Sequence, residues 1–190
     1  MPKISLSSPD SNTRYRANPI DFKACRAFRM EVVEEAGLIE DFWDAYSDHI
    51  ALYCDDVLIA TYRIVRPFEN RLPVNEHGPN LPVSAADRQI GRFVTSRSRW
   101  TFESFLYFYR QYQQHLREMA GRVYIATARW GPISGKRYLS LGFNDTGIGY
   151  KDDRYPYELT ILVKEPDYRK GIVLASDQDA LSEERVCDSI

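Results

Sequence analysis

Residues 89–100 constrain the fold of this chain more than any other stretch. The first seven, from Gln89 to Thr95, form a pattern typical of a buried strand, and the next five form a polar loop rich in arginine. From Thr101 onward, apolar residues recur at helical spacing, and the pattern ends near Gly121. Val123–Ala128 is again a buried-strand pattern. We therefore predict a strand, loop, helix and strand, in which the two strands run parallel.

The remaining patterns complete a small α/β (α+β) protein with a mixed, mostly antiparallel central sheet flanked by helices. Ile50, Leu52, Val57 and Ile59 alternate around a Cys54-Asp55-Asp56 turn, which predicts a hairpin. The other predicted elements are a strand over 13–17, a helix from Asn18-Pro19 to Gly37, a helix from Gly131-Pro132 to Gly142, a turn region over Phe143–Gly149 and a strand over Tyr157–Val163.

A length of 190 residues suits one domain with a real core. We assign residues 13–165 to that domain, with a flexible N-terminus over 1–12 and a polar tail over 166–190. A net charge of −2 argues against a general nucleic-acid binder. The three cysteines lack zinc spacing, and no apolar run suits a signal peptide or a membrane span. We expect a cytoplasmic protein with no metal and no integral membrane segment.

The loop after the first strand of this unit has the features of a phosphate site. Arg97 and Arg99 supply positive charge, and Thr101 opens a helix whose free N–H groups favour an anion. Neither nucleotide-binding glycine motif is present. An extended thioester carrier fits better, because its phosphopantetheine arm can follow the strand edge while its phosphate meets the loop. The alternative is two solvated arginines beside a helix cap.

Several motifs resemble the GNAT acyltransferase superfamily, and within it the acyl-homoserine lactone synthases and N-acyl amino acid synthases. Gln-Ile-Gly-Arg-Phe-Val-Thr (89–95) is similar to their E-x-x-R-F-x-V strand, and Thr-Tyr-Arg-Ile-Val-Arg-Pro (61–67) to their G-x-x-R-L-x-P strand. Tyr138 begins a Y-x-x-x-G-F motif found in many GNAT enzymes. The helix containing Arg29 resembles the first helix of the synthases. The resemblance covers roughly residues 14–163.

The resemblance implies an N-acyltransferase. An amine would attack an acyl thioester, and backbone N–H groups at Phe93, Val94 and Thr95, where the strand separates from its neighbour, would hold the oxyanion. Tyr138 would protonate the leaving thiolate, and a carboxylate such as Asp44, Asp48 or Glu158, or a water chain, would accept the amine proton. Arg63, Arg92 and Arg29 would bind the acceptor, together with the carboxylates of Asp44 and Asp48. The structural alternatives are ion pairs of Arg63 and Arg92 with Asp44 or Asp48, and a Tyr138 packed in the core.

Two departures from the family pattern bear on the donor and the chemistry. Residues 99–104 carry Phe102 and Ser104 where GNAT phosphate loops have glycine, which favours an acyl-carrier protein over coenzyme A. Gln89 replaces a family glutamate and cannot act as a base. We expect no tightly bound cofactor, an acyl thioester as co-substrate, and an amino acid or other small amine as acceptor. The alternatives are an acetyl-CoA-dependent N-acetyltransferase and a non-catalytic acyl-binding domain.

Overall fold

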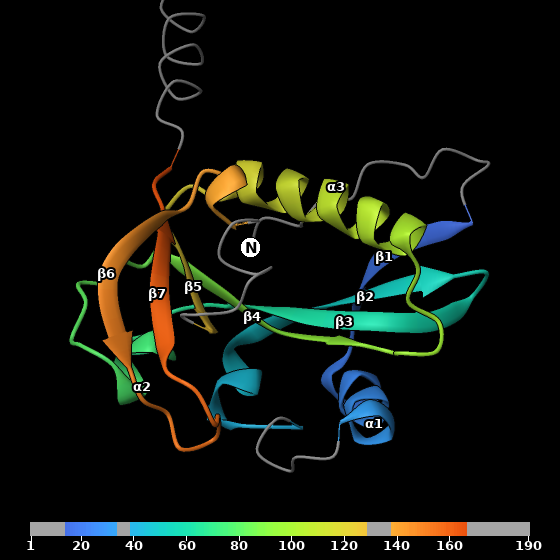
Figure 1. Cartoon of the computed structure of the whole chain (residues 1–190), viewed down its shortest axis with the longest axis horizontal. Helices are drawn as coiled ribbons and strands as arrows, with labels where there is room; N and C mark the ends of the chain where they lie inside the picture. Colours follow the sequence, from blue (N-terminus) through green and yellow to red (C-terminus); the bar gives the residue numbers. More distant parts are fainter. Residues whose placement is uncertain (1–13, 34–38, 129–137, 167–190) are drawn as a thin grey trace, which may run out of the picture.

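A computed structural model describes residues 14–33, 39–128 and 138–166. The described residues form one sheet in the order β1-β2-β3-β4-β5-β7-β6 (Figure 1). Every neighbouring pair is antiparallel except β4 and β5, which are parallel, so the predicted mixed sheet is confirmed. The strands are β1 (Tyr15–Ile20), β2 (Ser47–Cys54), β3 (Val57–Val65), β4 (Arg88–Thr95), β5 (Val123–Ala128), β6 (Asn144–Tyr150) and β7 (Leu159–Lys164).

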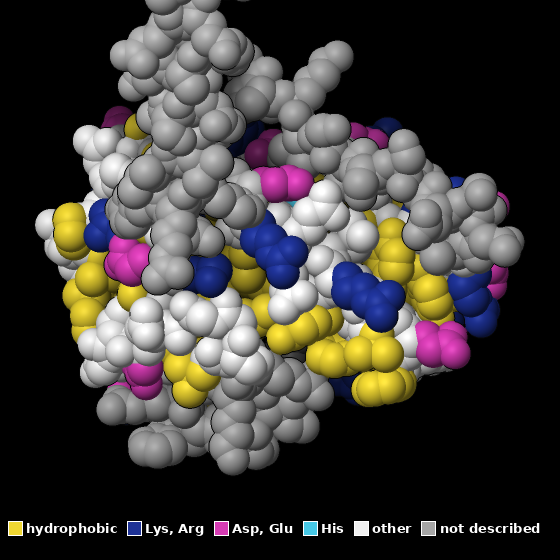
Figure 2. Space-filling view, turned by 90° about the horizontal axis from the view of Figure 1, so that it is seen from above, with side chains coloured by type: hydrophobic (Ala, Val, Ile, Leu, Met, Phe, Trp, Pro, Cys, Tyr) yellow, Lys and Arg dark blue, Asp and Glu magenta, His cyan; other side chains and the backbone are white. Residues whose placement is uncertain are grey.

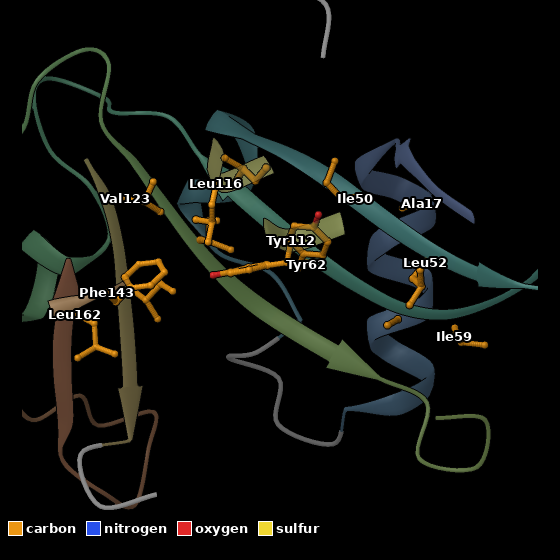
Figure 3. Packing of buried hydrophobic residues seen from close by; sticks show 14 of the residues in the cluster. Ala17, Ile50, Leu52, Ile59, Tyr62, Tyr112, Leu116, Val123, Phe143 and Leu162 are labelled. Atoms are coloured by element: carbon orange, nitrogen blue, oxygen red, sulfur yellow. The ribbon is translucent and has the colours of Figure 1, made fainter. Parts of the chain in front are cut away.

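Helices lie on both faces of this sheet. The long helix α3 (Phe102–Glu118) crosses one face, and α1 (Phe22–Val32) lies against the other (Figure 1). Two short helices join α1 on its side, namely the 3-10 helix η2 (Phe42–Tyr46) and α2 (Val74–His77). Under α3, Tyr62 of β3 packs with Tyr112 and Leu116 of the helix (Figure 3). A smaller apolar cluster on the opposite face includes Trp43, Val65 and Ile161.

The predicted helix start at Asn18-Pro19 is wrong. β1 continues through Pro19, and α1 begins at Phe22, where the Asp21 side chain accepts the N–H of Ala24 at 3.0 Å. β1 pairs only with β2 and is an edge strand, a position that tolerates proline. The predicted stop at Gly37 and the predicted start at Gly131-Pro132 lie outside the described residues.

Two further predictions from the spacing of apolar residues are wrong. In both cases the residues lie on the outside of the protein, where this spacing is a poor guide. The predicted turn over Phe143–Gly149 is strand β6, whose polar residues suit its place at the sheet edge. On α3, Phe102 is 73% exposed, although the periodicity places it in the core. Figure 2 shows hydrophobic side chains beside arginine and lysine on that face of the molecule. The buried face of α3 instead carries Ser104, Tyr112, His115 and Leu116.

Candidate active site

The two parallel strands at the centre of the sheet separate almost as soon as they meet. Their pairing is limited to Arg88 with Val123 and Gln89 with Tyr124. Beyond this point β4 stays paired with β3, and β5 stays paired with β7. The diverging strands are visible in Figure 1. On the facing edges of β4 and β5, backbone groups that would join a longer parallel ladder are left without a strand partner.

A bulge in β4 marks the same place. The register between β3 and β4 shifts between Thr61 and Arg63, opposite residues 91–94. Arg92 has a φ of +53°, the left-handed region that non-glycine residues rarely occupy. Bulges of this kind redirect side chains and are common beside active sites. The bulge therefore accounts for the way Arg92 is presented at the opening between the strands.

A cavity of 310 Å³ lies at this opening. Residues 90–92 of β4 and 126–128 of β5 form its walls, and residues 152, 154, 155 and 157 of the β6–β7 connection close one side. The strands part at Ile90, which is earlier than we predicted from Phe93, Val94 and Thr95. Val94 and Thr95 remain paired with β3, and the ring of Phe93 stacks on Phe108 of α3, with the ring centroids 4.3 Å apart.

The start of η2 positions Asp41, which lines the cavity, and Asp44, which belongs to the same hydrogen-bond network. The Asp41 carboxylate accepts the N–H of Trp43, and the Asp44 carboxylate accepts the N–H of Asp41, each at 2.9 Å. This reciprocal cap fixes both carboxylates. The guanidinium of Arg63 then donates to Asp41 at 2.6 and 2.9 Å and to Asp44 at 2.8 Å. Asp44 also accepts from Nη1 of Arg29, at 3.0 Å.

Arg92 joins this network from the cavity side. Its Nη2 donates to Oδ2 of Asp41 at 2.5 Å, while its buried Nη1 has no hydrogen-bond partner among the described residues. Burial lowers the pKa of Arg92, and the charge of Arg63 lowers it further. Burial alone would raise the pKa of Asp41, but Arg63 and Arg92 together bring it below its usual value. Arg63 thus pairs with Asp44, one of the two partners considered in the sequence analysis, while the main partner of both Arg63 and Arg92 is Asp41.

The three candidate proton acceptors lie in different surroundings. Burial opposes ionisation of Asp44, but Arg63 and Arg29 outweigh it and lower its pKa, which makes Asp44 a weak base. The side chain of Asp48 is 41% exposed and pairs with Arg66 at 3.8 Å instead of with Arg63 or Arg92, and Asp48 does not line the cavity. Glu158 is half-buried between Tyr157 and Leu159, two residues that line the cavity.

Arg29 lies behind the cavity rather than in it. Its side chain is fully buried, and its Nη2 lies 3.4 Å from Nδ1 of His49. Because arginine can only donate, Nδ1 must accept, and Nε2 carries the proton that His49 donates to the Asp44 carbonyl at 3.3 Å. Arg29 therefore holds Asp44 in place without lining the cavity, and its contact with His49 requires the neutral form of that histidine.

This geometry predicts that stability falls as the pH drops below about 6.5, the usual histidine value. Burial lowers the pKa of His49, and so does the positive charge of Arg29. As the pH falls below 6.5, His49 takes up a proton in the unfolded chain but stays neutral in the folded chain. The stability that a neutral His49 contributes is therefore complete above pH 6.5 and is lost as the pH falls. One such group contributes up to about 1.4 kcal/mol per pH unit.

Urea unfolding of wild type and His49→Gln between pH 7.5 and 5 measures this effect. We expect a shallower slope in the variant. Burial also lowers the pKa of His115, so part of the slope should persist. Equal slopes in the two proteins would contradict the assignment.

Tyr138 lies on the α3 side of the sheet. Its half-buried ring packs on Phe143 and Tyr112, with centroid distances of 5.8 and 6.5 Å. Burial raises the pKa of its hydroxyl, so Tyr138 is a neutral proton donor at physiological pH. The core packing considered as the alternative for Tyr138 is present, and its role as the proton donor stays a prediction.

The arginine loop retains part of its predicted character. Arg97 and Arg99 are exposed in a turn that closes when the N–H groups of Arg99 and Trp100 donate to the Ser96 carbonyl. The amides of Thr101 and Ser104 bind the side chains of Ser104 and Thr101, respectively. These two N–H groups at the start of α3 thus already have acceptors, and Arg97 and Arg99 supply exposed positive charge beside them.

Sequence reasoning missed Arg154 and Asp152. Nε and Nη2 of Arg154 donate to the Asp152 carboxylate at 2.9 and 2.6 Å, and its Nη1 lies 3.7 Å from Oδ2 of Asp41. The only local signal was a polar, tyrosine-rich segment before the last strand. Gln89 was singled out, but its role is structural, because its Oε1 accepts the N–H of Val74 at the start of α2, at 2.8 Å.

Two other expectations concern metals and membranes. Within the described ranges, no group of histidine, cysteine, aspartate and glutamate side chains is arranged to hold a metal ion. None of the helices in the described part combines the length and apolar character needed to cross a membrane.

The fold is similar to those of known acyltransferases. FeeM, an N-acyl amino acid synthase from uncultured soil microbes, is 15% identical over 83% of this chain and 94% of its own, with a TM-score of 0.54. The AHL synthase LasI is 16% identical over 80% and 90%, with a TM-score of 0.58. A GNAT family acetyltransferase from Elizabethkingia anophelis with acetyl-CoA bound is 11% identical over 80% and 98%, with a TM-score of 0.54.

These likenesses show that the chain has the GNAT fold, as its resemblance to that superfamily implied. No family model matches the sequence, and no curated protein sequence is similar enough to match it.

Proposed function

We propose that this chain is a GNAT-type N-acyltransferase that moves an acyl group from a thioester on an acyl-carrier protein to the amine of an amino acid or related small acceptor. The separation of β4 from β5 after Gln89 and Tyr124 is the observation that carries this proposal. It leaves a narrow opening between two strand edges, with a charged cavity at its mouth. An extended thioester fits the opening, and a small polar acceptor fits the cavity.

The proposed reaction begins when the neutral amine attacks the thioester carbonyl and forms a C–N bond. Backbone N–H groups of β4 between Ile90 and Arg92, where the strand has left its neighbour, would stabilise the oxyanion. Collapse of the tetrahedral intermediate breaks the C–S bond, and Tyr138 would protonate the departing thiolate. The amine proton would pass to Glu158 or to water, since Asp44 is a weak base and Asp48 lies outside the cavity.

The loop before α3 supports the choice of donor. Residues 99–104 contain no glycine, and the side chains of Thr101 and Ser104 occupy two amides of the helix N-terminus. A pyrophosphate needs close backbone approach and free N–H groups. A pantetheine arm carries a single phosphate, and the exposed Arg97 and Arg99 would bind it by charge-assisted contacts.

Mass spectrometry of organic extracts from cells that overproduce the protein tests this function. We expect an N-acyl product that is absent from cells with Arg92→Ala, a variant whose folding is checked by circular dichroism. Purified protein should use octanoyl acyl-carrier protein in preference to octanoyl-CoA. Transfer from acetyl-CoA alone would favour the acetyltransferase alternative. Tight acyl binding with no transfer from any donor would refute the proposal and favour a binding domain.

A further inference from the structure

The ion pairs around the cavity contain more positive than negative charge. Their guanidinium groups belong to Arg29, Arg63, Arg92 and Arg154, and their carboxylates to Asp41, Asp44 and Asp152. One positive charge in this described set has no counterpart. Because an unpaired buried charge is costly, such a site favours the entry of an anion.

Arg63 is a poor candidate for binding that anion. Its side chain is 5% exposed, and both of its Nη atoms already donate to Asp41 or Asp44, so only its single buried Nε lacks a partner among the described residues. A new ligand would have to break charge-assisted hydrogen bonds to reach it. The role of acceptor binding that the sequence suggested for Arg63 is therefore better assigned elsewhere.

Apart from the buried Nε of Arg63, two N–H groups of cavity-lining arginines have no hydrogen bond among the described residues. Nη1 of Arg92 is buried and has no hydrogen-bond partner in the described part of the chain. For Nη1 of Arg154, the described residues supply only the 3.7 Å contact with Asp41. Both arginines line the cavity and approach the same carboxylate oxygen, Oδ2 of Asp41. Asp152 holds Nε and Nη2 of Arg154, so the direction of its guanidinium is already set.

We propose that Arg92 and Arg154 together form a carboxylate-binding subsite, and that Arg154 selects acceptors that carry a carboxylate next to the amine. The inference rests on the proposed acyl transfer and specifies its acceptor. A carboxylate between the two guanidinium groups would balance the excess charge and satisfy Nη1 of Arg92. Arg154 is 30% exposed and comes from the β6–β7 connection, so the selection is made by a segment outside the central strands.

The test compares acceptors that differ only in the carboxylate. Purified wild type, Arg154→Leu and Arg154→Lys are given octanoyl acyl-carrier protein with a mixture of the common protein amino acids, or with the amines that lack only their carboxylates. For the amino acids, we expect Arg154→Leu to raise KM by roughly 10- to 100-fold with little change in kcat, the size expected for a hydrogen bond to a charged group. Use of the amines should change little.

Two further variants serve as controls for the effect of Arg154→Leu. Arg154→Lys keeps a positive charge beside Asp152 and should show an intermediate KM, because lysine lacks the planar fork. Arg66→Leu removes a half-exposed arginine that pairs with Asp48 and does not line the cavity, and this variant should behave as wild type. Equal use of amines and amino acids, or an equal loss for both in Arg154→Leu, would overturn this inference alone. No product from any acceptor would overturn the proposed function as well.

Discussion

Replacing Asp41 with asparagine should lower the free energy of unfolding by about 3–5 kcal/mol, the usual cost of leaving a buried ion pair without one partner. Asp41 accepts from both Arg63 and Arg92, whose side chains are 5% and 6% exposed. Asparagine offers one acceptor oxygen and no charge, so the variant would keep two buried cations with only Asp44 between them. No other single carboxylate in the described network contacts three arginines.

Urea denaturation of the purified proteins at pH 7 measures this loss, with Asp48→Asn as the matched control. Asp48 carries the same charge, but the side chains of Asp48 and Arg66 are 41% and 42% exposed, and ion pairs open to solvent contribute about 0–1 kcal/mol. An equal small change in both variants would show that the network around Asp41 does not stabilise the fold.

Replacing Tyr138 with phenylalanine should reduce kcat by about 10²–10⁴-fold, the range for loss of a general acid. The variant keeps the ring that packs on Tyr112 and Phe143, so thermal stability should change little. A product assay with octanoyl acyl-carrier protein, followed over pH, measures the effect. The proposed function has to hold for this test to apply, because the assay needs acyl transfer.

Tyr112→Phe is the control for the aromatic layer. Its hydroxyl is buried and has no hydrogen-bond partner among the described residues, so its removal should leave activity unchanged. A loss in Tyr112→Phe equal to that in Tyr138→Phe would point to packing rather than proton transfer. A rate for Tyr138→Phe within a few-fold of wild type would exclude Tyr138 as the acid.

Local patterns in the sequence were sufficient for the order of most elements and for the mixed sheet. Val123–Ala128 is a strand with the predicted bounds, and the hairpin of β2 and β3 turns at Asp55-Asp56, as the alternation indicated. These predictions succeed because strand alternation and turn chemistry depend on neighbours in the chain. The helical spacing of α3 correctly included Tyr112 and Leu116, which are buried, but it also included the exposed Phe102, because aromatic residues occur on several sides of the helix.

The sequence by itself indicated that Arg63 and Arg92 belong to a site near a strand–loop–helix junction, with ion pairs to Asp44 or Asp48 as the structural alternative. Only the tertiary structure decided that Asp41 pairs with Arg63 and Arg92 and that Asp48 does not. It also decided that Arg154, from the β6–β7 connection, approaches Asp41. Arg92 and Asp41 are 51 residues apart in the chain, and their contact depends on the pairing of β3 with β4 and on the position of η2. The early separation of β4 from β5 was equally hidden, since the strand pattern of residues 89–95 continues past the point where its partner turns away. The pairing of strands that are distant in the chain depends on the packing of the whole sheet, and this pairing brings the residues of the site together.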